Sequence, residues 1–176
     1  MTCIKPPSSA GRAVALASAV PLVASWARLS VRWAALWAML VLSPTALAQT
    51  GPQPRLLTTP LTAGMHIIQA ELAMTPEQQA TGMMFRREMG THEGMLFVTE
   101  EPAVRCFWMR NTLIPLSIAF IADDGTIVNI AEMDALSERS HCATRPVRLA
   151  LEMNSGWFAK RGIKAGARLQ GKPFRP

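Results

Sequence analysis

Residues 116–133 read LSIAFIADDGTIVNIAEM, and this stretch does most to define the fold. Two runs rich in β-branched and aromatic residues flank DDGT, and Asp124-Gly125 as a two-residue loop is among the strongest local signals for a β-hairpin. The register that this loop sets pairs Ile121 with Val128, Ala119 with Ile130 and Ser117 with Glu132. The sequence therefore predicts an antiparallel pair with two polar side chains, Ser117 and Glu132, facing each other at its far end.

Short strands and turns continue on both sides of this hairpin. Further strands are expected at residues 66–72, 94–99, 104–109, 145–153 and 167–170. Thr75 as N-cap, Pro76 at the first helical position and Gln78 in a capping box predict a short helix that ends near Met83. A second short helix is expected over GWFAKRG, ended by Gly162. The expected fold class is α+β: a compact, mostly antiparallel curved sheet or small β-barrel with two short helices, without the βαβ alternation of a parallel sheet.

The first 48 residues differ in kind from the rest. The first fifty residues contain no Asp or Glu, and Arg28 and Arg32 precede the apolar run WAALWAMLVL, which is followed by ALA at residues 46–48. This pattern is typical of a secretory signal peptide cleaved between Ala48 and Gln49, which predicts a periplasmic or secreted protein. A retained membrane anchor and a later translation start are the alternatives.

The domain organisation follows from that leader. We expect residues 1–48 to be the cleaved signal peptide, 49–63 a flexible lead, 64–172 a single globular α+β domain and 173–176 a tail. The whole chain has a net charge of +6, but residues 49–176 retain 14 basic against 12 acidic residues. No basic stripe interleaved with aromatic residues occurs, so nucleic acid is not an expected partner. After cleavage no stable membrane span is expected.

Two cysteines remain after cleavage, because Cys3 lies in the leader. An even pair in an exported chain favours a Cys106–Cys142 disulfide. Free buried thiols and a reactive or metal-binding thiol remain the alternatives.

Several motifs carry a family resemblance. MFRREM, EGMLFV, FWMRNTLIPLSIAF, DGTIVNI and LEMNSGWFAKRGIKAG occur in this order. They resemble the Domain of Unknown Function 192 family, also called uncharacterised protein family 0127, in an exported, proteobacterial-type member. The resemblance covers about residues 65–171 and implies a compact, β-rich α+β domain with no established activity. Ser117 stands where the family commonly has Asp.

The segment FWMRNT interrupts two apolar runs and holds most of the candidate ligand-binding residues: Trp108, Arg110, Asn111 and Thr112. Asn and Thr side chains bond to nearby backbone, and Asn tolerates positive φ, so this segment is interpretable as a structural corner. The alternative is a pocket in which these side chains face a polar or anionic ligand.

Glu152 completes the candidate site, because it lies within the apolar strand LALEMN. A buried carboxylate needs a partner, and Arg86, Arg110 and Arg148 are the candidates for an ion pair. The alternative is a general acid or base with a raised pKa, and Glu132 beside Ser117 invites the same comparison.

The functional hypothesis is a non-catalytic periplasmic binding or interaction module with a polar pocket around FWMRNT. Its partner would be a small polar ligand or an envelope component. The alternative is an enzyme that acts on the envelope through Glu152 or Glu132 as general acid or base, and no catalytic residue is assigned. No metal and no cofactor are expected. Residues 49–176 contain nine methionines, which makes Cu(I) binding an alternative, but they lie in apolar stretches that favour core packing, and the three histidines are scattered.

Overall fold

The computed structural model describes residues 51–174, so the predicted signal peptide, its cleavage point and the last two residues of the tail lie outside the described part. One seven-stranded sheet makes up most of the domain, with strand order β6-β5-β8-β3-β2-β1-β9. Its strands are β1 Thr58–Ala63, β2 His66–Ala73, β3 Glu93–Ala103, β5 Leu116–Ile121, β6 Ile127–Met133, β8 Val147–Asn154 and β9 Leu169–Gln170. The remaining elements are α1 Pro76–Thr81, the ribbon strands β4 Cys106–Phe107 and β7 His141–Cys142, and the 3₁₀ turn η1 Ala159–Arg161.

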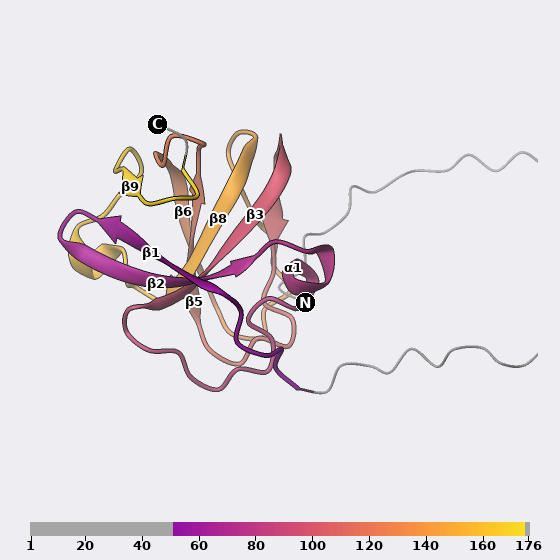
Figure 1. Cartoon of the computed structure of the whole chain (residues 1–176). Helices are drawn as coiled ribbons and strands as arrows, with labels where there is room; N and C mark the ends of the chain where they lie inside the picture. Colours follow the sequence, from indigo (N-terminus) through magenta and orange to yellow (C-terminus); the bar gives the residue numbers. More distant parts are fainter. Residues whose placement is uncertain (1–50, 175–176) are drawn as a thin grey trace, which may run out of the picture. The chain divides into compact units, whose positions relative to one another are not determined.

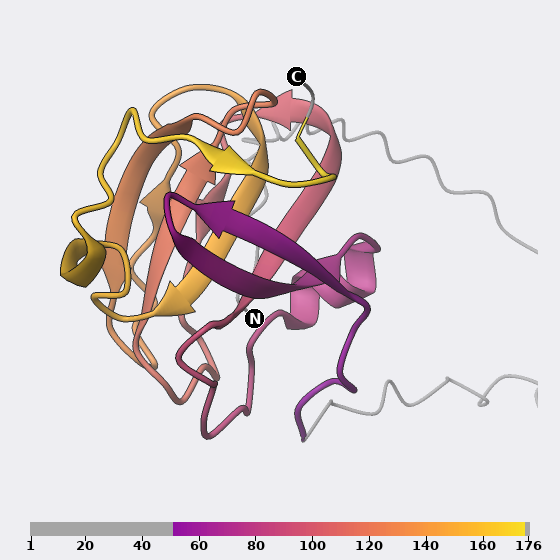
Figure 2. The ribbon, with the colours of Figure 1, turned by 60° about the vertical axis from the view of Figure 1, so that its left-hand side comes forward.

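The sheet curls strongly, so that β1, β2 and β9 cross over the inner face of β5 and β8 (Figures 1 and 2). An isolated antiparallel bridge joins Thr126, just before β6, to Arg168, just before β9. The two ends of the strand order therefore meet at one point, while the rest of β6 has no strand partner on its outer side within residues 51–174. The result is a mostly-β half-barrel, which agrees with the expected curved sheet.

The helical content is lower than expected. Thr75 and Gln78 form the predicted capping box, and α1 starts at Pro76. The second expected helix is only the 3₁₀ turn η1. Gly156 and Gly162 flank this turn with φ angles of 72° and 66°, and this left-handed backbone stops a helix from extending in either direction. The description α+β with two helices is therefore only roughly right.

One strand pair departs from the antiparallel pattern. β2 and β3 are parallel neighbours, joined by a crossover that contains α1 and the loop of residues 82–92. Parallel neighbours need a long connection, and this one is long enough. The expectation that the chain has no βαβ unit was therefore wrong at this position.

The central hairpin has the predicted register over most of its length. Ala119 lies opposite Ile130, and Ser117 lies opposite Glu132. Ile121, however, lies opposite Ile127 instead of Val128, because a β-bulge shifts the register next to Ile121. The bulge lies beside the turn, so the pairing at the polar end keeps the predicted register.

Two other strands differ in extent from the prediction, because pairing with neighbouring strands determines where they begin and end. Residues 58–63, assigned to the lead from the sequence, form β1 and pair with β2. Of the strand expected at residues 104–109, only Cys106 and Phe107 are extended, in a separate ribbon with β7. The Cys106–Cys142 disulfide crosses that ribbon, as predicted.

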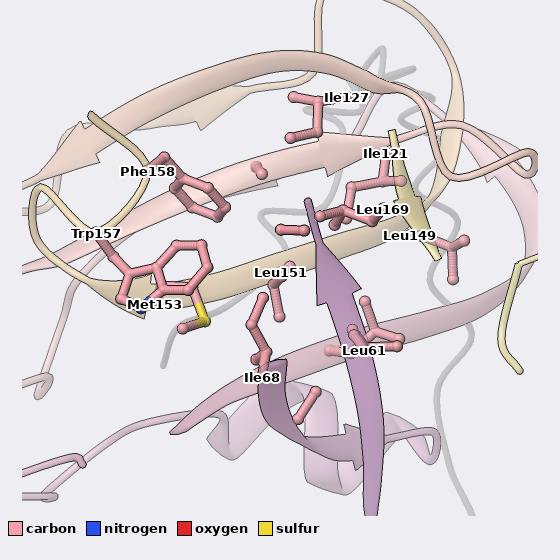
Figure 3. Packing of buried hydrophobic residues seen from close by; sticks show 14 residues of the cluster. Leu61, Ile68, Ile121, Ile127, Leu149, Leu151, Met153, Trp157, Phe158 and Leu169 are labelled. Carbon is pink, nitrogen blue, oxygen red and sulfur yellow. The ribbon is translucent and has the colours of Figure 1, made fainter. Parts of the chain in front are cut away.

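Two apolar clusters lie on opposite faces of the sheet. The inner cluster gathers Leu61, Ile68, Leu151, Trp157 and Phe158 under the curl (Figure 3). The outer cluster includes the Phe97, Phe107 and Phe120 rings and four buried methionines, Met83, Met95, Met109 and Met133. Both faces of the central strands are thus buried. In the part of the chain that the structure describes, no helix is long and apolar enough to cross a membrane.

Candidate functional site

The FWMRNT segment forms a corner held by backbone hydrogen bonds. Asn111 has a left-handed φ of 59°, as the sequence predicted for a turn, and Thr112 N donates to Met109 O at 3.0 Å. Further backbone bonds tie the corner to two other loops: Phe85 N donates to Asn111 O, and Leu136 N donates to Thr112 O. These bonds support the structural interpretation of the motif.

The polar side chains of the corner do not converge on one point. Arg110 is exposed, lies 5.8 Å above the Trp108 ring, and pairs loosely with Glu138 at 3.8 Å. The Thr112 hydroxyl and the Trp108 indole nitrogen are buried, and neither has a hydrogen-bond partner among the described residues. The motif thus combines a built corner with two unpaired polar groups.

Glu152 is fully enclosed in the outer face of the sheet. It lies on β8 between Met95 of β3 and Ile118 of β5, and both carboxyl oxygens lack a hydrogen-bond partner within residues 51–174. Burial raises the pKa of this carboxyl to about 8. Glu152 is therefore protonated and neutral at pH 7.

The ion pair expected for Glu152 is wrong, because the candidate arginines bind elsewhere. Arg86 forms a buried bidentate pair with Glu71 of β2, and its Nη2 lies 2.7 Å from Glu71 Oε2. Arg148 lies at the start of β8. Its Nε donates to Asp123 at 2.7 Å, and its Nη1 donates to the backbone oxygen of Thr99.

The Glu71–Arg86 pair was not predicted as such. Burial of Glu71 opposes ionisation, but hydrogen bonds from Arg86 and the backbone N–H of Leu56 outweigh it and lower the pKa of Glu71. The pair anchors the segment before β1 and the loop after α1 to β2. No local pattern joins these residues, because the partners come from separate segments.

Glu132 and Ser117 form a polar cluster with the turn that follows β8. Ser117 Oγ lies 2.7 Å from both carboxyl oxygens of Glu132 and accepts the backbone N–H of Gly156 at 2.8 Å. Glu132 Oε2 also accepts from Ser155 Oγ at 2.9 Å and from Gly156 N at 3.0 Å. The sequence predicted Ser117 and Glu132 as a pair, but not their bonds to the turn after β8.

This cluster borders an open hollow of about 470 Å³, which we name the Glu132 pocket. Its lining residues are Asn129, Ile130, Glu132, Phe158, Ala159, Gly162, Ile163, Lys164 and Ala165. The pocket lies between the unpaired outer edge of β6 and the segment around η1. Ile130, Phe158 and Ile163 make its wall largely apolar, while Glu132 and Lys164 place one charge of each sign on it.

Glu132 and Glu152 lie on opposite faces of the sheet. Ser117, the partner of Glu132, is flanked on its own face by Ala119 of the inner cluster. Glu152 alternates along β8 with Leu151 and Met153, both of which belong to the inner cluster, so its side chain points outward. The two carboxylates therefore cannot act together on one substrate. Around neither of them, within residues 51–174, is there a group of three or more His, Cys, Asp or Glu side chains that could hold a metal ion.

The fold and these sites define a small, disulfide-linked, mostly-β domain with a curled sheet. The chain belongs to the DUF192 family, described as "Uncharacterized ACR, COG1430", whose model matches residues 59–171. Among solved structures, a chain from Sinorhizobium meliloti 1021, described as a candidate transcription regulator, is 34% identical with a TM-score of 0.65. The match covers 69% of this chain and 99% of that one.

A second solved structure, a protein of unknown function from Novosphingobium aromaticivorans DSM 12444, is 39% identical with a TM-score of 0.64. The match covers 70% of this chain and 94% of that one. No curated protein matches the chain. The comparisons thus establish the family and the fold, and leave the activity to be argued from the site.

Proposed function

We propose that this domain is an exported, non-catalytic binding module and that its ligand occupies the Glu132 pocket. The observation that supports this proposal is a carboxylate held in one orientation beside an apolar wall. Three donors, Ser117 Oγ, Ser155 Oγ and Gly156 N, fix Glu132 at the edge of the pocket. Ligand pockets of several hundred Å³ commonly combine an apolar lining with a few such fixed polar groups.

The two oxygens of Glu132 are not equivalent. Oε2 lies within hydrogen-bond distance of all three donors, whereas Oε1 is near only the Ser117 hydroxyl, whose single proton both oxygens share. Oε1 therefore retains acceptor capacity for a ligand. The ligand that fits is a small molecule with an ammonium or amide N–H group next to an apolar body.

Catalysis by the same groups is less well supported. Ser117 is fully buried and its oxygen already accepts the N–H of Gly156, so it is poorly placed as a nucleophile. Glu152 is equally enclosed, and a general acid must lie within hydrogen-bond reach of its substrate. These geometries favour binding over reaction.

The disulfide supports export. Structural disulfides form and persist in oxidising compartments and are rare in the cytosol. The Cys106–Cys142 bond, together with the signal-peptide pattern of residues 1–48, favours a periplasmic or secreted location. Mass analysis of protein isolated from its own host without reductant tests this point: a chain that begins at Met1 or carries two free thiols would contradict it.

Native mass spectrometry and titration test the binding site. Protein from its own host should retain a small molecule, and the purified chain should bind phenethylamine, used as a probe, more tightly than phenylacetate. Glu132→Gln preserves an acceptor for the three donors but removes the negative charge, so it should lower the affinity for phenethylamine at least tenfold. Glu88→Gln, which changes an exposed carboxylate that does not line the pocket, is the matched control. Equal affinities for amine and anion, or an unchanged Glu132→Gln variant, would contradict the proposal.

A second candidate site is the FWMRNT corner. The observation in its favour is the pair of buried, unpaired polar groups on Trp108 and Thr112, beside the exposed Arg110. Arg110→Ala distinguishes the two sites: loss of the retained ligand without loss of stability would favour the corner, whereas loss of stability alone would assign Arg110 to the structure.

A further inference from the structure

A second hollow, of about 450 Å³, lies on the other side of the Gly162–Ile163 turn, and we name it the Arg161 pocket. Residues of the β1–β2 turn form one wall, and the segment from Arg161 to Arg168 forms the other. Its titratable lining residues are His66, Arg161 and Arg168, and no Asp or Glu is among the residues that line it. Three basic side chains thus line one concave surface without a lining acid.

The Arg161 guanidinium is held in place by Trp157, and its Nε lacks an acceptor within residues 51–174. Its guanidinium lies 4.3 Å above the Trp157 ring, and Nη1 donates to Trp157 O at 3.1 Å. Nε is buried and has no partner among the described residues. The Trp157 ring is itself fixed by edge-on contacts with His66 and Phe158. A positioned guanidinium with an unpaired buried N–H indicates a missing acceptor.

Arg168 adds a second guanidinium whose charge is not neutralised by a salt bridge within residues 51–174. Its Nε donates to the backbone oxygen of Asp124 at 2.7 Å, which fixes the side chain. The pKa of the nearby Asp124 carboxyl is lowered mainly by hydrogen bonds from the N–H and hydroxyl of Thr126, and the charge of Arg168 makes a smaller contribution. The terminal nitrogens of Arg168 therefore have donors to offer a ligand.

We propose that the Arg161 pocket binds a phosphate group carried by a small molecule. Planar guanidinium groups match phosphate oxygens with two parallel hydrogen bonds each, and two of them with an imidazole satisfy a dianion. The pocket is several times larger than one phosphate, and Ala63, Met65 and Ile163 provide an apolar surface for the rest of the molecule. This site is separate from the Glu132 pocket and does not depend on the function proposed for it.

Nuclear magnetic resonance titration of the full chain tests the proposal. The probes are inorganic phosphate, methyl phosphate and acetate, and the signals are the backbone amides of Gly162 and Ile163 and the arginine Nε groups. Phosphate and methyl phosphate should shift these signals saturably, and acetate should bind at least tenfold more weakly. Arg168→Gln and Arg161→Lys should each weaken phosphate binding roughly ten- to a hundredfold. Lys160→Gln, which removes one exposed charge beside Arg161 without touching the pocket, should leave it unchanged.

The controls separate folding from binding. Arg161→Lys keeps the positive charge but loses the planar guanidinium. Weaker phosphate binding with an unchanged melting temperature therefore assigns the effect to recognition. If Lys160→Gln weakens phosphate as much as Arg168→Gln, binding is non-specific and the proposal is wrong. Arginine-dependent co-sedimentation with phosphatidic acid vesicles, but not with phosphatidylcholine vesicles, would identify a lipid headgroup as the source of the phosphate. Binding of free methyl phosphate alone would identify a soluble ligand.

Discussion

Glu152 predicts an unusual pH dependence of stability. Its carboxyl is fully buried without a hydrogen-bond partner in the described chain, and burial raises its pKa from the ordinary value of 4.5 to about 8. Between these values the folded protein keeps a proton that the unfolded chain releases. Stability is therefore greatest below pH 4.5 as far as this group is concerned, and it is lost as the pH rises through about 8.

The magnitude follows from the shift. Each pH unit between the two pKa values costs about 1.4 kcal/mol of unfolding free energy, so the full shift amounts to on the order of 5 kcal/mol. Domains of this size have a total stability of roughly 5–15 kcal/mol, so the loss is large. Glu152→Gln keeps the shape of the protonated carboxyl and cannot ionise. The variant should therefore be close to wild type near pH 5 and more stable than wild type at pH 9.

Urea unfolding followed by tryptophan fluorescence at several pH values measures this difference. The quantity to plot is the unfolding free energy of Glu152→Gln minus that of the wild type, because contributions common to both proteins cancel. The exposed control Glu88→Gln should give a flat line. A difference between wild type and Glu152→Gln that stays constant from pH 5 to pH 9 would show that Glu152 ionises normally, and the argument from burial would fail.

Three other variants test the packing of the domain. Replacing Cys106 and Cys142 together by Ala removes a crosslink that closes a loop of about 37 residues, and should cost on the order of 3–4 kcal/mol in a thermal melt; unchanged stability would contradict this. Arg86→Met leaves the buried Glu71 with only the exposed Arg55 and the backbone N–H of Leu56 as partners and should cost about 3–5 kcal/mol in urea unfolding; protonation of Glu71 at low pH should reduce that cost. Gly94→Ala places a Cβ 2.6 Å from the backbone and 2.4 Å from a methionine sulfur of β8, so it should lower the melting temperature sharply or prevent folding, and a melting temperature within a degree or two of wild type would refute that geometry.

Local patterns were sufficient for most of the fold. The capping box at Thr75, the hairpin pairs Ser117–Glu132 and Ala119–Ile130, and the disulfide were all readable from the sequence and are present. These features depend on residues close in sequence or on simple counting. The bulge beside Ile121 was not predicted. The residues opposite it are also bonded to a segment far along the chain, since Ile127 N donates to Ala167 O and Gly166 N donates to Ile127 O.

The site was only partly predictable for the same reason. The sequence singled out Glu132 and Glu152 as carboxylates among apolar neighbours, yet their environments are opposite. β8 lies between β3 and β5, so Glu152 is covered on both sides, whereas β6 is the last strand of the sheet and Glu132 is exposed at its edge. Strand order is a property of long-range pairing, and no local pattern distinguishes a central strand from an edge strand of similar composition. The Arg161 pocket was not predicted from the sequence, because His66 on one wall comes from the start of β2, far in sequence from Arg161 and Arg168 on the other.

The same geometry explains why both pockets occur where they do. After Phe158 the chain would have to run alongside β6 to close the barrel, but Gly162 and Gly166 turn the backbone through left-handed φ angles of 66° and 88°. This segment is joined to β6 by backbone hydrogen bonds at Ile127, where Gly166 N donates to Ile127 O and Ile127 N donates to Ala167 O. The gap left along the rest of β6 is the Glu132 pocket, and the space on the other side of the Gly162 turn is the Arg161 pocket. Two glycines thus keep the barrel open, and Ile163 between them contributes to both walls. A residue that filled either left-handed position would strain the turn and disturb both pockets together, whereas substitutions of Glu132 or Arg168 should affect one pocket only.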